Sequence, residues 1–121
     1  PAAAAAGVEV RWLPSEAWWP EMASYRFILS PLGNGISSTK TCEALLVLTV
    51  PIVQRGGYPL HDDLAGYGFP IVIVDSWQEV TRGNLALWWE KLSPRLKSFR
   101  DNCITTEAYW RLITGQVTRC E

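Results

Sequence analysis

The sequence predicts an α/β domain that is half of a doubly wound fold, with a short parallel sheet flanked by helices. Two compact apolar runs, Val50 to Val53 and Pro70 to Val74, are typical of parallel strands that are covered on both faces. Segments with helical periodicity lie before and after these runs, which gives the alternation of strands and helices found in such domains. The chain has 121 residues, and one domain of this kind accounts for that length.

Charge and hydropathy exclude several classes of protein. The 11 Lys and Arg residues nearly balance the 12 Asp and Glu residues, so the formal net charge is -1. Because there is no excess of positive charge, we expect no nucleic-acid partner. The longest apolar stretch, Ala44 to Val53, is about half the ~20 residues that a membrane-spanning helix needs, so we expect no membrane span.

The first expected elements are a lead-in, a strand and a helix. Residues 1–23 are rich in Trp and Pro, which suits an irregular or briefly helical lead-in. The aromatic and β-branched segment Tyr25 to Ser30 predicts a strand that runs into a loop. Serine caps favour a helix over roughly residues 38–48, which ends ahead of Pro51. The domain itself is expected to occupy residues 24–121.

The later elements continue the alternation. A short helix is expected near Asp62 to Ala65, between the two apolar runs. Thr81 begins a long amphipathic helix that Pro94 is expected to break or kink. The apolar face of this helix is formed by Leu85, Trp88, Trp89, Leu92, Leu96 and Phe99. A last helix is predicted over about Thr105 to Thr114 and stops at Gly115. It is expected to bury Tyr109, Leu112 and Ile113.

The cysteines and the single histidine form no metal-binding pattern. Cys42, Cys103 and Cys120 have no CxxC spacing, and His61 has no second His to join it. We therefore expect no metal site. The favoured interpretation of the cysteines is three reduced, partly buried thiols. The alternative is that Cys103 pairs with Cys120 in an oxidising compartment and leaves Cys42 free.

A glycine-containing loop lies between the first predicted strand and the first predicted helix. The segment Ser30 to Gly35 reads Ser-Pro-Leu-Gly-Asn-Gly. At the start of a helix, unpaired backbone N–H groups and the helix dipole favour phosphate, but the same residues also make an ordinary turn. Two interpretations of Lys40 are open: it adds positive charge toward a diphosphate, or it is a solvated lysine. Glu43 accepts hydrogen bonds from a ribose diol or pairs with Lys40 three residues earlier.

Several ordered segments of the chain resemble one protein family. Ser30 to Gly35, Thr41 to Leu45 and Val50 to Val53 are similar to the patterns S-P-R-G-N-G, W-E-A-L and I-P-I-V. These patterns belong to the carboxyl-terminal, nucleotide-sugar-binding half of exostosin-like and related GT-B glycosyltransferases. The likeness continues through the second apolar run to Trp77–Thr81, and it covers about residues 24 to 100.

The resemblance implies a Rossmann-like half of a GT-B fold that binds a nucleoside diphosphate sugar as donor, with no cofactor and no obligatory metal. Gly33, Asn34 and Gly35 would line the donor phosphates. Lys40 stands where the family often has Arg, and Glu43 would hold the ribose. The implied partners are the nucleotide sugar, a glycan or other hydroxyl acceptor, and a second domain or subunit. If the resemblance holds in a eukaryote, it places the protein in the secretory pathway or Golgi lumen.

The chain also departs from the family pattern. Leu32 replaces an Arg that would contact phosphate, Cys42 replaces Trp, and Leu48 replaces a small Gly. The residues before Tyr25 are too few to form the acceptor-binding amino-terminal domain of a GT-B enzyme. Because transfer needs an acceptor held in line with the sugar, we expect the isolated chain to be inactive.

His61 and Asp75 are the local candidates for a catalytic base. The alternatives are a structural histidine and a turn or cap carboxylate. Trp88 and Trp89 lie on the apolar face of the long helix, which favours core packing over a platform for sugar rings. We therefore expect a glycosyltransferase-like, donor-binding domain. The alternative function is a noncatalytic binding or assembly module on a half-Rossmann scaffold.

Overall fold

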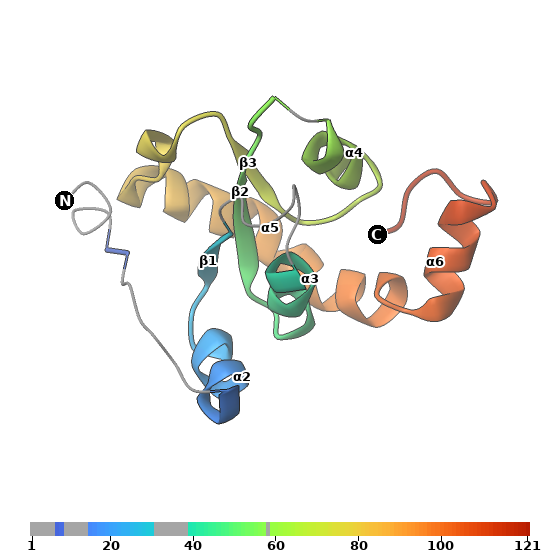
Figure 1. Ribbon diagram of the computed structural model, residues 1–121, viewed down its shortest axis with the longest axis horizontal. Helices are drawn as coiled ribbons and strands as arrows, with labels where there is room; N and C mark the ends of the chain where they lie inside the picture. The colour runs from blue at the N-terminus through green and yellow to red at the C-terminus, as the bar shows by residue number, and fades with distance from the viewer. Residues whose placement is uncertain (1–6, 9–14, 31–38, 58) are drawn as a thin grey trace.

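The fold consists of one small parallel sheet with helices around it (Figure 1). The computed structural model describes residues 7–8, 15–30, 39–57 and 59–121. The three-stranded sheet has the order β1-β2-β3. This arrangement confirms the predicted α/β class and is that of a Rossmann-like half-fold. In chain order the elements are α2 (Ser15–Ala23), β1 (Phe27–Ser30), α3 (Thr39–Leu46), β2 (Val50–Gln54), α4 (Leu60–Gly66), β3 (Val72–Val74), the 3-10 helix η1 (Trp77–Glu79), α5 (Arg82–Cys103) and α6 (Thr106–Ile113).

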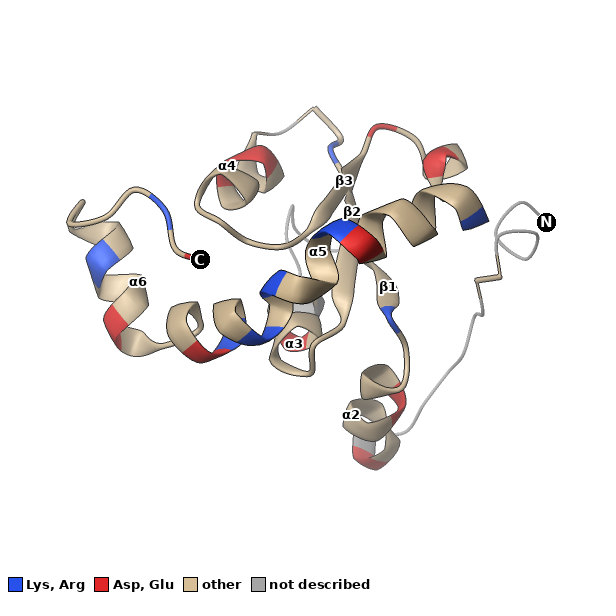
Figure 2. Ribbon diagram, turned by 180° about the vertical axis from the view of Figure 1, so that it is seen from behind, with Lys and Arg blue, Asp and Glu red and all other residues tan. Residues whose placement is uncertain are grey.

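The central strand β2 is buried on both faces of the sheet. Leu29 of β1 lies opposite Ile52, which lies opposite Val72 of β3. Four consecutive residues of β2, Val50 to Val53, are buried, and successive side chains of a strand point to opposite faces. The two opposite views place α5 across one face of the sheet and α3 across the other (Figure 1, Figure 2). The prediction of a strand covered on both faces is therefore confirmed for Val50 to Val53. The second apolar run contains β3, in which Val72 and Val74 are buried on one face and Ile73 is half-buried on the other.

Helix α5 carries the side chains that close one face of the core. The Thr81 hydroxyl accepts a hydrogen bond of 3.2 Å from the backbone N–H of Asn84, so it caps this helix as predicted. The face of α5 that was predicted to be apolar is buried in the core or packed against it. The Trp89 ring stands edge-on to Phe27, with the ring centroids 5.8 Å apart. The tryptophans of α5 thus pack in the core, as expected.

Pro94 does not interrupt α5, which is continuous over 22 residues. Of the break or kink expected at Pro94, the break is wrong. A proline inside a helix leaves the carbonyl of the residue four positions earlier without its N–H partner. Here that residue is Glu90, and both it and Pro94 are exposed. Water can therefore reach this side of the helix, which limits the cost of the missing hydrogen bond.

Helix α6 corrects a second expectation about burial. Its Tyr109 and Ile113 side chains are 66% and 59% exposed, so the prediction that they are buried is wrong. Ala108 is the buried residue of this helix, and Leu112 is half-buried. The reason is the position of α6, which lies beside the layers, next to the end of α5, and not over the sheet (Figure 1). Its start at the Thr105 cap agrees with the sequence prediction.

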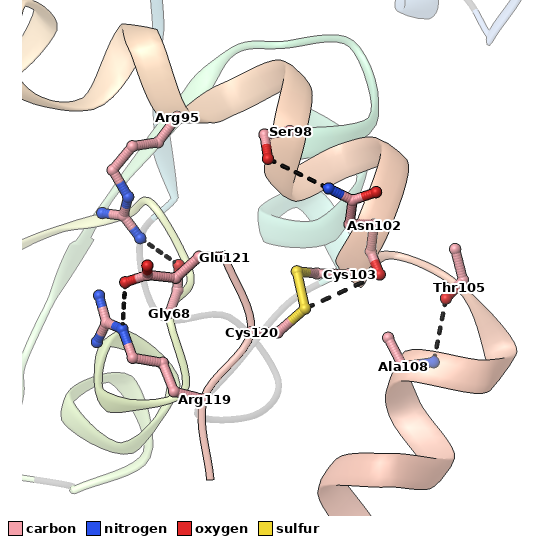
Figure 3. Close-up of a disulfide and its surroundings, with 10 residues drawn as sticks. All are labelled: Gly68, Arg95, Ser98, Asn102, Cys103, Thr105, Ala108, Arg119, Cys120 and Glu121. Atoms are coloured by element: carbon pink, nitrogen blue, oxygen red, sulfur yellow. Dashed lines mark hydrogen bonds and ion pairs between the residues drawn. A yellow bond between two sulfur atoms is a disulfide. The ribbon is translucent and has the colours of Figure 1, made fainter. Parts of the chain in front are cut away.

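The carboxyl-terminal tail is joined to the end of α5 by a disulfide between Cys103 and Cys120 (Figure 3). The favoured expectation of three reduced thiols is therefore wrong, and the alternative pairing, with Cys42 free, is confirmed. Gly115 ends α6 as predicted, with a left-handed φ of 76°. The chain then turns back, and the backbone N–H of Cys120 donates to the carbonyl of Tyr67 at 2.7 Å.

Leu48 holds an unusual backbone conformation between α3 and β2. In the described part of the chain it is the one non-glycine residue with a positive φ, at 61°. In this left-handed region the Cβ of an L-residue crowds the backbone, at a cost of about 1–2 kcal/mol. This turn explains why α3 ends at Leu46, slightly before the predicted end of the helix.

We expect Leu48→Gly to be more stable than Leu48→Ala by about 1 kcal/mol, although alanine usually gives a higher free energy of unfolding than glycine. Both changes remove the same half-buried side chain, so their difference isolates the strain of the left-handed backbone. Urea denaturation of the two variants measures it. A higher free energy of unfolding for the alanine variant would contradict the left-handed conformation of Leu48.

Candidate functional site

The candidate site lies at the carboxyl edge of the sheet, where open α/β sheets bind their ligands. β1 ends at Ser30 and α3 begins at Thr39, so the two described residues that flank the glycine loop lie at this edge. The buried hydroxyl oxygens of Ser30 and Thr41 are 3.3 Å apart and form a hydrogen bond. This bond joins the last residue of β1 to the first turn of α3. The predicted phosphate-binding residues, Gly33 to Gly35, lie outside the described residues.

Helix α3 carries the two charged residues predicted to bind the donor. Lys40 lies in its first turn, but the side chain is outside the described part of the chain. Glu43 lies one turn further and is half-buried. Its carboxylate oxygen Oε2 accepts a hydrogen bond from the indole Nε1 of Trp18 at 3.0 Å. Sequence reasoning missed this contact because 25 residues separate the two side chains and no periodicity joins them.

The thiol of Cys42 lies beside Glu43 on the same helix. Desolvation first, and then the negative charge of Glu43, raises the pKa of Cys42. The thiol is therefore held protonated at neutral pH. Nucleophilic cysteine chemistry needs the thiolate, so this environment opposes such a role.

Arg55 forms an ion-pair cluster just beyond β2, at the same edge. Its Nε donates to Asp62 Oδ2 at 3.0 Å, and its Nη1 contacts Asp75 Oδ1. The hydrogen bond to Asp62, followed by that to Asp75, holds the pKa of Arg55 above its usual value. Arg55 thus links the carboxyl ends of β2 and β3, in a cluster where two carboxylates outweigh one guanidinium. The one sequence feature that could have indicated a functional role for Arg55 is its place shortly after a predicted strand.

The two residues considered as catalytic bases lie in different settings. His61, the second residue of α4, is 2% exposed, and its Nδ1 has no hydrogen-bond partner. Asp75 is exposed and pairs with Arg55, while its backbone N–H donates to Glu79 at 2.6 Å. Both residues lie in the described part of the chain, and no hydrogen bond joins them. The contacts of Asp75 are those of a turn and ion-pair residue, and its role as a base stays a prediction.

The described structure establishes the fold class of the chain, and comparison with known proteins identifies no family. No protein-family model matches the chain, and neither a curated protein nor a solved structure matches it at a significant level. Within the described ranges, no three His, Cys, Asp or Glu residues gather in a group that could hold a metal ion. Nor does any helix in the described part of the chain have the length and apolar character to cross a membrane. The chain is thus a Rossmann-like α/β half-fold, and its family stays a prediction.

Proposed function

We propose that this chain is the donor-binding domain of a glycosyltransferase, which holds a nucleoside diphosphate sugar for transfer to an acceptor hydroxyl. The observation that carries the proposal is the position of Glu43. Its half-buried carboxylate lies on α3, the helix that follows β1 and begins at the carboxyl edge of the sheet. A carboxylate suits a ribose diol because its two oxygens accept from two neighbouring hydroxyls.

A second observation supports the same assignment. The resembled family has glycine at the position of Leu48, and Leu48 has the left-handed φ of 61° that favours glycine. The family's glycine and the left-handed backbone therefore agree at this position.

Hydrogen-bond donors at the carboxyl edge support binding of a diphosphate. The family's phosphate-binding Arg is replaced by Leu32, so the loop has lost one cation. Arg55 lies after the neighbouring strand with two of its three guanidinium nitrogens held by Asp62 and the third held by Asp75. A guanidinium has five N–H donors, so further donors remain for an anion. Because Asp62 and Asp75 outweigh the charge of Arg55, the cluster has no net positive charge. In the proposed function, Arg55 therefore contributes N–H donors to the diphosphate and does not replace the charge that is lost at Leu32.

We expect uridine or guanosine diphosphate to bind without a divalent metal, and Glu43→Gln to weaken this binding by about 1–3 kcal/mol. The substitution removes the charged acceptor for the ribose and keeps the shape of the side chain. Isothermal titration calorimetry with and without EDTA measures both effects.

Plain pyrophosphate is the control ligand for this experiment. It has no ribose, so Glu43→Gln should leave its affinity unchanged. An equal loss for nucleotide and pyrophosphate would show that Glu43 acts through the loop or the fold. The absence of binding by either nucleotide at millimolar concentration would refute the proposed function.

The alternative function is a noncatalytic binding or assembly module, and the outward face of α6 favours it. Tyr109, Trp110 and Ile113 lie on this face, and Trp110 is 61% exposed. Their spacing puts all three on one side of the helix. Exposed apolar patches of this kind commonly mark protein-protein contacts.

For this alternative, we expect self-association that Trp110→Ser weakens about tenfold or more, since exposed tryptophans often dominate such contacts. Multiangle light scattering over a range of concentrations measures the change. Leu87→Ser, at an exposed position of α5, is the matched control and should leave the association unchanged. A chain that is monomeric throughout would oppose the assembly function.

A further inference from the structure

The contact between Trp18 and Glu43 bears directly on the proposed ribose site. The donor atom is the indole Nε1 and the acceptor is Oε2, at a distance of 3.0 Å, in a partly buried setting. A hydrogen bond to an ionised carboxylate is stronger than one between neutral groups. Glu43 is therefore already bound to a group of the protein at one of the two oxygens that a ribose diol would use.

Helix α2 carries Trp18 and is fixed to the body of the domain at its other end. Met22 is buried, and its carbonyl accepts a hydrogen bond of 3.0 Å from the hydroxyl of Thr49. The same hydroxyl lies 3.0 Å from the carbonyl of Tyr25. This anchor lies beyond Trp18 along the chain, at the start of β2. Release of the indole from Glu43 therefore does not require release of the anchor.

We propose that α2 is an autoinhibitory helix in which Trp18 competes with the ribose of the donor for Glu43. The inference rests on the proposed function, because it assigns Glu43 to the ribose. In the free domain, the indole N–H satisfies the half-buried carboxylate. A bound nucleotide replaces that single donor with the two hydroxyls of the ribose. Donor binding and the Trp18–Glu43 hydrogen bond therefore compete for Oε2, so each weakens the other.

The test compares uridine diphosphate and pyrophosphate binding by calorimetry in matched variants. Trp18→Phe keeps an aromatic ring and removes the N–H, so it should bind uridine diphosphate about three- to tenfold more tightly. Its affinity for pyrophosphate should not change. Trp19→Phe alters the exposed neighbour on the same helix and should behave as the wild type. Circular dichroism establishes that each variant is folded.

A second measurement follows the indole itself. In ¹⁵N-labelled protein, the Nε1–H resonance of Trp18 should move on addition of uridine diphosphate and in the Glu43→Gln variant. If the nucleotide binds but Trp18→Phe does not tighten it, or the resonance stays in place, the autoinhibitory contact is refuted and the proposed function survives. If no variant binds nucleotide, or if Glu43→Gln has no effect on a nucleotide that does bind, the ribose site itself fails and the inference fails with it.

Discussion

Replacement of Phe99 by alanine should lower the free energy of unfolding by about 3–5 kcal/mol. Phe99 is 1% exposed and is the largest of the fully buried side chains in the described part of the chain. Its ring packs against that of Phe69, with the centroids 4.8 Å apart. The substitution removes this contact and leaves a cavity between α5 and the sheet. Urea denaturation followed by circular dichroism measures the loss.

Leu87→Ala is the matched control for Phe99→Ala on the same helix. Leu87 is 64% exposed, so its truncation should change the free energy of unfolding by less than about 0.5 kcal/mol. Phe99→Leu should fall between the two, since it retains much of the buried volume. Similar losses of stability at Leu87 and Phe99 would contradict the packing of the Phe99 side of α5 against the sheet.

The strands and the long helix were predictable because their signals are local. The runs at Val50 and Val72 contain consecutive apolar residues, and a strand covered on both faces leaves no polar alternation. Thr81 and Thr105 cap helices through their own hydroxyls, within three residues of the N–H that they bind. Such contacts depend on neighbouring residues only, so the sequence contains the information needed to find them.

The burial of α6 could not be predicted in the same way. Tyr109 and Ile113 have the helical spacing of an apolar face, but spacing does not specify which element covers that face. The position of α6 depends on the turn at Ile104 and Thr105, which takes the chain away from the sheet. The continuity of α5 through Pro94 likewise depends on solvent exposure, which is a tertiary property.

The candidate site was only partly accessible to sequence reasoning. The pattern predicted a strand, a loop and a helix that carries Glu43, and the described strand and helix follow in this order. It did not predict the Trp18 donor or the cluster of Arg55 with Asp62 and Asp75. These contacts join different elements, and without pairwise information a sequence does not specify which charged or polar side chains meet.

The cysteine pairing shows the same limit and leads to the last prediction. The tail returns to the end of α5 and lies against the loop after α4, where Arg95 Nη2 donates to the carbonyl of Gly68 at 2.5 Å (Figure 3). Gly68 has a φ of 104°, and a Cβ built on it would overlap the backbone carbonyl of Cys120. The disulfide to Cys103 holds Cys120 in place, so the tail cannot easily withdraw.

We therefore expect Gly68→Ala to lower the free energy of unfolding by about 3 kcal/mol in the oxidised protein, from backbone strain and displacement of the tail. Gly66→Ala, at the end of α4, meets no atom within 4 Å and should be neutral or slightly stabilising. Reduction alone should cost the wild type about 3 kcal/mol, because a loop with a sequence separation of 17 is no longer closed.

The two changes should not be additive, because they act on the same contact. In the reduced protein Cys120 keeps its hydrogen bond to Tyr67 but is no longer held by the disulfide, so it can shift more easily. The penalty of Gly68→Ala should then fall toward the strain of its backbone alone, about 1–2 kcal/mol. Denaturation of both proteins with and without a reductant completes this cycle. Equal penalties in the two redox states would show that the tail does not press on Gly68, and the close approach of Cys120 to this loop would then be wrong.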